Sequence, residues 1–177
     1  MTQAQATATS FQCERMTITT SRSFDDVLAR LRERLGIARI EQYPAAIHHA
    51  GSSQANFESV VRSQLGPSGF MLFCEIDHSQ WLPAYGVRRR VLRLIFGNPL
   101  IAITMMRDDV TVGLFAPVEA LLIEHEGAKG CTVVYVLPST LIASSNPVLL
   151  PAARDLDNKV DDLIRDATGA QRASLAT

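Results

Sequence analysis

The fold of this chain is constrained most by residues 69–105, which contain two strand-like runs and a junction that leads into a helix. Residues 70–77 (FMLFCEID) and 91–96 (VLRLIF) are short runs rich in large apolar side chains, which is typical of strands. The Gly97-Asn98-Pro99 junction predicts a sharp turn into a helix, because asparagine can cap a helix and proline suits its first position. The residues that follow, LIAITMM, are apolar all round, so this helix should be buried.

Sequence patterns outside this stretch predict three more strands and three amphipathic helices. Two strand-like runs flank the turn-like segment Gly127–Gly130, which predicts a β-hairpin. Ser23 suits the N-cap of the first helix, and the last helix should end near Gly169. The expected strands are 14–20, 118–125 and 131–137, the expected helices are 23–36, 57–65 and 146–169, and residues 37–53 are ambiguous.

This order of elements favours the α+β class, with an antiparallel or mixed sheet of about five strands that is backed by helices on one face. The length of 177 residues fits one domain. We therefore expect a single α+β domain over residues 14–169. A disordered leader should precede it over residues 1–13, and a flexible tail should follow over residues 170–177.

Composition argues against several kinds of partner. The net charge of −1 provides no field that would attract nucleic acid or an anionic membrane surface, so we predict neither as a partner. The longest apolar region, residues 91–106, is broken by Arg93 and is shorter than the roughly 20 residues that span a bilayer. The N-terminal residues do not resemble a signal peptide. We predict a soluble, cytoplasmic protein.

The three cysteines, Cys13, Cys74 and Cys131, are odd in number and widely spaced. This pattern favours free thiols in a reducing compartment. Cys74 and Cys131 lie in apolar runs, and we interpret both as small core residues.

Glu75, Asp77 and His78 form the strongest candidate cluster, at the end of the 70–77 strand. Two carboxylates and an imidazole could bind a divalent metal, or a carboxylate could tune His78 as a general base. Alternatively, Asp77 caps the following turn and Glu75 pairs with an arginine from residues 88–93. The sequence contains no phosphate-binding loop and no HExxH, GxSxG or paired-cysteine motif, so it assigns no metal, cofactor or catalytic residue.

Trp81, Met105 and Met106 either fill the core or form a soft-walled pocket for an apolar or planar ligand. The candidate ligand-binding residues are Glu75, Asp77, His78, Trp81, Asn98, Met105 and Met106.

Several ordered motifs together resemble the domain of unknown function 302 family. They are residues 69–82 (GFMLFCEIDHSQWL), Gly97-Asn98-Pro99, residues 113–124 (GLFAPVEALLIE) and residues 133–138 (VVYVLP). The resemblance covers roughly residues 14–166. It implies a fold like that of the TATA-box-binding protein, with a curved antiparallel sheet backed by helices, often dimeric. A shared fold does not imply DNA binding.

This chain departs from shorter members of that family. Many of them carry cysteines where Gly97 and Val118 stand here, so thiol chemistry does not transfer. The segment 37–66 is also longer than in compact members. The family supplies no accepted catalytic residues.

Three functional hypotheses remain. The leading one is a binding or interaction domain that holds a small ligand between the sheet and the segment around His78, Trp81, Met105 and Met106. The second is an enzyme in which Glu75 or Asp77 orients His78 as acid or base. The third is a structural homodimer module, because both faces of the central strands are largely apolar and a partner copy would cover the face without helices.

Overall fold

A computed structural model describes residues 4–48, 54–144 and 146–171, and its centre is one open sheet. The sheet has six strands in the order β1-β6-β5-β4-β3-β2. All neighbouring strands are antiparallel except β2 and β3. The strands are β1 (Arg15–Thr20), β2 (Gly36–Ile37), β3 (Met71–Asp77), β4 (Val91–Gly97), β5 (Val118–Glu124) and β6 (Cys131–Val136). The predicted mixed sheet of the α+β class is confirmed, and β2 is an addition of two residues.

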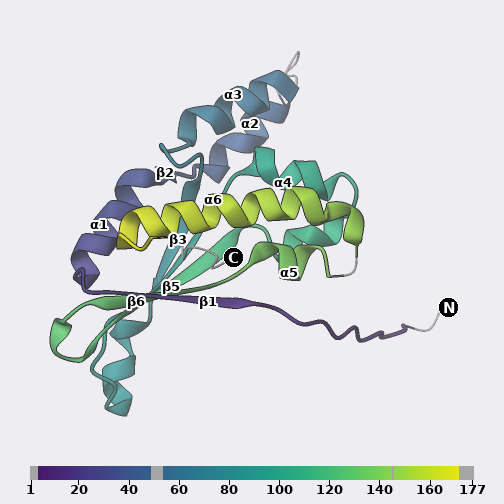
Figure 1. Cartoon of the computed structure of the whole chain (residues 1–177). Helices are drawn as coiled ribbons and strands as arrows, with labels where there is room; N and C mark the ends of the chain where they lie inside the picture. The colour runs from purple at the N-terminus through teal and green to yellow at the C-terminus, as the bar shows by residue number, and fades with distance from the viewer. Residues whose placement is uncertain (1–3, 49–53, 145, 172–177) are drawn as a thin grey trace.

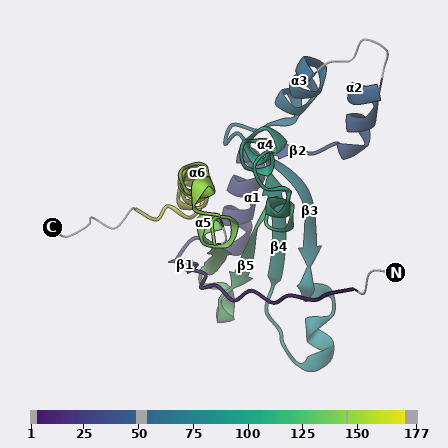
Figure 2. The ribbon, with the colours of Figure 1, turned by 90° about the vertical axis from the view of Figure 1, so that its right-hand side faces the viewer.

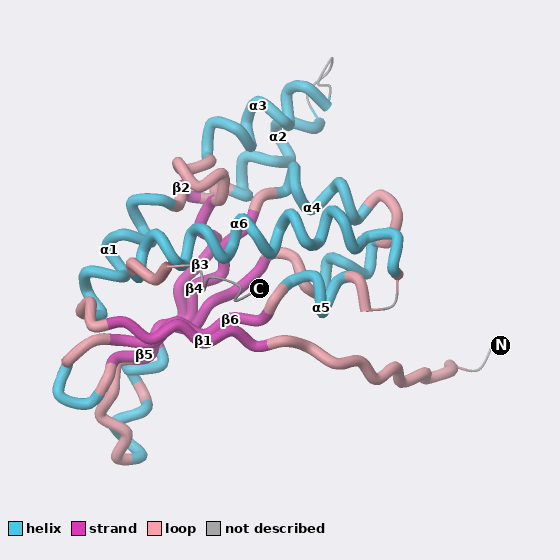
Figure 3. Tube along the Cα trace, viewed as in Figure 1, coloured by secondary structure: helices cyan, strands magenta, loops and turns pink. Residues whose placement is uncertain are grey.

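Helices cover one face of this sheet (Figures 1 and 2). The α-helices in the described residues are α1 (Phe24–Arg34), α2 (Tyr43–His48), α3 (Gln54–Gln64), α4 (Pro99–Met106), α5 (Pro138–Ile142) and α6 (Leu150–Thr168). In the segment 37–53, which was ambiguous from sequence, the structure places α2, whereas α3 is the helix predicted over residues 57–65 and begins three residues earlier. Both helices project beyond the end of the sheet (Figure 3). No helix in the described part of the chain is long and apolar enough to cross a bilayer.

Local sequence signals account for the two helices that pack on the middle of the sheet. The Ser23 hydroxyl accepts a hydrogen bond from the Asp26 N–H at 3.1 Å, so it caps α1 as predicted. The apolar stripe of α6 is buried from Ala153 to Ala167, and this helix ends at Gly169, whose φ of +74° suits glycine.

The hairpin between β5 and β6 also forms where the sequence predicts it. A 3₁₀ turn (Glu126–Ala128) joins the two strands. Gly130 has φ of +108°, and a Cβ atom there would lie 2.3 Å from the backbone oxygen of Thr20. Only glycine fits this position, because both the dihedral angle and the neighbouring strand exclude a side chain.

The core lies between the helices and the sheet. Leu92, Leu94 and Phe96 of β4 are buried toward the helices, together with Val133 and Tyr135 of β6. The residues between them in each strand, including Arg93 and Ile95, therefore lie on the face without helices. The side chains of Arg93 and Ile95 are only partly exposed in the single chain.

A β-bulge in β3 changes which side chains share a face. Simple alternation predicts Phe73, Glu75 and Asp77 together, with Cys74 on the core side. The register instead shifts between Leu72 and Cys74, so Leu72 pairs with Phe96 and Glu75 pairs with Leu94. The extra residue is Phe73, which moves the residues after it to the opposite face. Cys74 is consequently exposed, which corrects its interpretation as a core residue, whereas Cys131 is buried as expected.

Within residues 4–171 of the described chain, regular structure begins at Arg15 and ends at Thr168. Residues 4–14 contain no helix or strand. Residues 1–3 of the predicted leader and 172–177 of the predicted tail lie outside the described residues.

Candidate functional site

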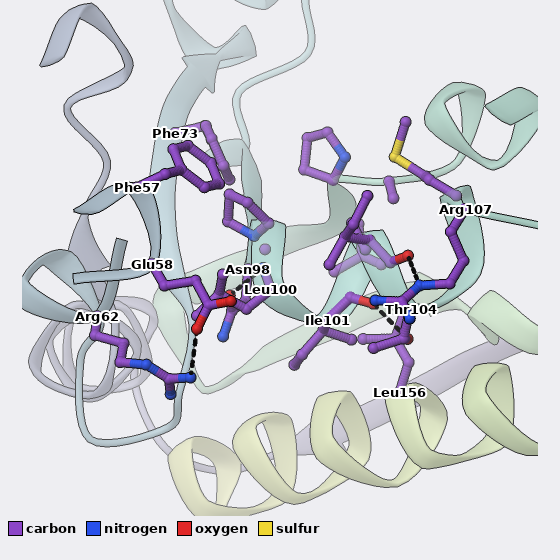
Figure 4. Close-up of a pocket in the computed structure, with 18 of the residues that line it drawn as sticks. Phe57, Glu58, Arg62, Phe73, Asn98, Leu100, Ile101, Thr104, Arg107 and Leu156 are labelled. Atoms are coloured by element: carbon purple, nitrogen blue, oxygen red, sulfur yellow. Dashed lines mark hydrogen bonds and ion pairs between the residues drawn. The ribbon is translucent and has the colours of Figure 1, made fainter. Parts of the chain in front are cut away.

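A large hollow lies around α4, where β4 ends and β5 begins. This cavity, called the α4 cavity below, has a volume of about 920 Å³. Its walls come from α3, α4, the segment Ala116–Val118 and Leu156 of α6 (Figure 4). Most of the side chains in these walls are apolar.

Gly97 and the bulge residue Phe73 shape one wall of the cavity. A Cβ atom at position 97 would lie 3.2 Å from the Pro117 Cβ and 3.5 Å from the Phe73 ring. The absence of a side chain at Gly97 therefore lets Pro117 and Phe73 pack closely beside the start of α4. Because the bulge removes Phe73 from the regular alternation of β3, its ring is free to line the cavity.

Asn98 fixes the start of α4. Its Oδ1 atom accepts a hydrogen bond from the Leu100 N–H at 2.8 Å, which confirms the predicted N-cap. Its Nδ2 atom donates to the backbone oxygen of Gly69 at 2.9 Å. Asn98 also lines the α4 cavity, but these two contacts tie it to the framework.

The charged groups of the cavity lie on two sides (Figure 4). On one side, Arg62 forms an ion pair with Glu58 at 3.3 Å, and Gln54 donates to Glu58 at 2.7 Å. These hydrogen bonds, from Gln54 and then from Arg62, lower the pKa of Glu58. On the other side, Arg107 donates from Nε to the backbone oxygen of Ile103 at 3.3 Å.

The two carboxylates of the sequence-predicted cluster bind other partners. Glu75 accepts two hydrogen bonds from the Arg32 guanidinium, at 2.8 and 2.5 Å, so its partner is on α1 rather than in residues 88–93. Asp77 accepts from the Ser79 N–H at 2.8 Å and caps the following 3₁₀ turn (His78–Gln80). Hydrogen bonds from the Ser79 side chain and backbone lower the pKa of Asp77.

His78 and Trp81 lie in the segment that joins β3 to β4, at the opposite end of β4 from the α4 cavity. Their rings meet edge to face with centroids 5.9 Å apart, and the Tyr85 ring continues this contact at 6.3 Å from Trp81. His78 borders a smaller hollow of about 330 Å³, together with Arg93 and Glu119 on the face without helices.

The seven predicted ligand-binding residues are therefore not brought together. Asn98 and Met106 line the α4 cavity, whereas Met105 is fully buried in the core. The seven residues of β4, about 23 Å at the usual rise, separate His78 and Trp81 from α4. Among the described residues there is no group of three or more His, Cys, Asp or Glu side chains that could hold a metal ion.

Sequence reasoning missed the α3 wall, Phe73 and Arg107. The α3 residues lie far from α4 in the chain, and the bulge has no local sequence signal. Helical spacing offered one clue, since Ile101, Thr104 and Arg107 recur every three residues and line the same cavity.

An open sheet with helices on one face is also the fold of a solved structure, the uncharacterized conserved protein DUF302 from Bacillus stearothermophilus. The two share 17% sequence identity with a TM-score of 0.59, over 86% of this chain and 97% of that chain. The chain belongs to the family described as domain of unknown function DUF302, whose family model matches residues 47–167. No curated protein matches the chain.

Proposed function

We propose that this protein is a small-ligand-binding domain and that the α4 cavity is its binding site. The observation that carries the proposal is the cavity itself. Its volume of about 920 Å³ lies within the range of roughly 300–1,000 Å³ that is usual for ligand sites. Its apolar walls and few polar groups are also typical of such sites.

The cavity walls contain solvent-exposed apolar side chains that a bound ligand would bury. Ile103 is 48% exposed, and it lies on α4 next to the polar Thr104. The prediction that this apolar helix is buried is therefore wrong, because only Met105 of α4 is buried. Burial of apolar surface contributes about 25 cal/mol per Å² before the costs of association are subtracted. An apolar ligand that covers this wall would therefore gain most of its affinity from the hydrophobic effect.

The polar groups of the cavity support binding rather than catalysis. Glu58 is ion-paired and has a lowered pKa, so it is a poor proton donor near neutral pH. Asn98 uses its amide to hold α4 in place. None of the groups described in the walls is arranged as a nucleophile beside a base.

Titration with a neutral fluorescent probe, N-phenylnaphthylamine, tests this function. We expect the wild-type protein to bind it with enhanced fluorescence and Thr104→Trp, which places an indole in the cavity, to weaken binding at least about tenfold. Ser59→Trp is the matched control, because Ser59 is exposed on α3 outside the cavity walls. Failure of the wild type to bind the probe, or equal binding by wild type and Thr104→Trp, would contradict the proposal.

A further inference from the structure

The distribution of charge in the α4 cavity is uneven. Glu58 and Arg62 neutralise each other on one side. On the other side, Arg107 has no carboxylate within ion-pair distance among residues 4–48, 54–144 and 146–171. The cavity therefore has one uncompensated positive charge.

The acidic residues that follow Arg107 in the chain do not compensate it. The Asp109 carboxylate accepts hydrogen bonds from the Thr111 N–H at 2.9 Å and from the Thr111 hydroxyl at 2.6 Å. Asp108 is exposed, and neither aspartate lines the cavity. Of the five N–H donors on the Arg107 guanidinium, the Nε–H contacts the backbone oxygen of Ile103.

Arg107 also ends a row of cavity residues on α4. Ile101, Thr104 and Arg107 follow one another at spacings of three residues, and Figure 4 shows them along one side of the cavity. The eight residues of α4 extend about 12 Å. An elongated ligand lying along this row would thus have one end beside apolar side chains and the other beside a guanidinium.

We propose that the ligand of this cavity is an amphipathic anion, with an unbranched apolar chain along α4 and a carboxylate bound by Arg107. This inference rests on the proposed function, since it names the ligand class of the same site. A planar guanidinium can bind a carboxylate through two parallel N–H···O bonds, and a neighbouring apolar wall strengthens such contacts by excluding water. Medium-chain fatty acids match both features.

The experiment compares decanoate with decanol, below their micelle or solubility limits, as competitors of the neutral probe. Because the alcohol is the more hydrophobic of the two, the informative quantity is the ratio of their dissociation constants. In Arg107→Gln we expect this ratio to shift about tenfold against decanoate, because only the carboxylate loses a charged partner. Arg88→Gln is the matched control, since Arg88 is exposed and outside the cavity, and it should leave the ratio unchanged.

The outcomes separate this inference from the proposed function. If Arg107→Gln leaves the ratio unchanged while the probe still binds, the assignment of an anionic ligand is wrong, and the proposal of an apolar binding site is unaffected. If wild type binds neither competitor nor the probe, the proposed function fails and the inference fails with it. Increasing salt should weaken decanoate binding more than decanol binding, and equal weakening would also contradict the role of Arg107.

Discussion

Replacement of Asn98 by alanine should remove two contacts that hold α4 against the sheet. The Oδ1 atom caps the helix through the Leu100 N–H, and the Nδ2 atom binds the Gly69 backbone oxygen ahead of β3. Gly69 lies 29 positions away in the chain, so the second contact joins the β3 and α4 segments directly. An ordinary helix cap makes only the first of these contacts.

The two losses should add to about 2 kcal/mol of unfolding free energy. Loss of an N-cap typically costs about 1 kcal/mol. Loss of the donor to a partly buried carbonyl costs roughly another 1 kcal/mol, because that oxygen must be desolvated without its partner. For a chain of this size, the melting temperature should fall by about 4–8 °C.

Asn146 provides a matched control in the same chain. It caps the 3₁₀ turn Pro147–Leu149, which also begins with proline, through a hydrogen bond from the Val148 N–H at 3.2 Å. This bond is exposed, so Asn146→Ala should cost no more than about 1 kcal/mol. Asn98→Ser, which keeps a capping oxygen but lacks the amide donor, should be intermediate.

Urea denaturation of the three variants and the wild type measures these costs. If Asn98→Ala is no more destabilising than Asn146→Ala, the contact with Gly69 contributes nothing and the reasoning is refuted. If Asn98→Ala retains wild-type stability but loses probe binding, Asn98 is a ligand-binding residue rather than a structural one.

Three further predictions concern thiols, pH and association. Burial raises the pKa of Cys131 to about 11, whereas Cys13 and Cys74 are exposed. Cys13 and Cys74 should therefore react rapidly with a thiol reagent at pH 8, and Cys131 should react only after denaturation. Rapid reaction of all three thiols would contradict this prediction. Burial also raises the pKa of Asp157 above its ordinary value of 3.8, despite hydrogen bonds from Ser139. The folded protein therefore binds the carboxyl proton of Asp157 more tightly than the unfolded chain does. The stability that this proton contributes is complete below pH 3.8 and is lost as the pH rises through the raised pKa. Asp157→Asn should therefore gain stability relative to wild type between pH 3 and pH 7, and a relative loss measured by denaturation would show the sign to be wrong. Finally, we predict a homodimer that covers the face without helices, where Ile76 is 40% exposed, and a monomer mass from light scattering at micromolar concentration would exclude it.

The sequence alone determined the elements whose signals are local. The N-caps Ser23 and Asn98, the turn at Gly127–Gly130 and the stripe of the last helix each depend on residues within a few positions of one another. Dihedral preferences and hydrophobic periodicity act over the same short range, so these predictions agree with the structure. The order of the elements then indicated the α+β class.

The tertiary structure decided what depends on register and on distant partners. Alternation along β3 could not reveal that Phe73 bulges, because the bulge is defined by pairing with β4. Glu75 could have paired with any of several arginines, and only the packing of α1 on the sheet selects Arg32, 43 positions away. The α4 cavity likewise joins α3 with the beginning of β5, which are distant in the chain. Local patterns identify which residues form a helix or strand, whereas a binding site depends on which elements meet, and that is set by packing of the whole chain.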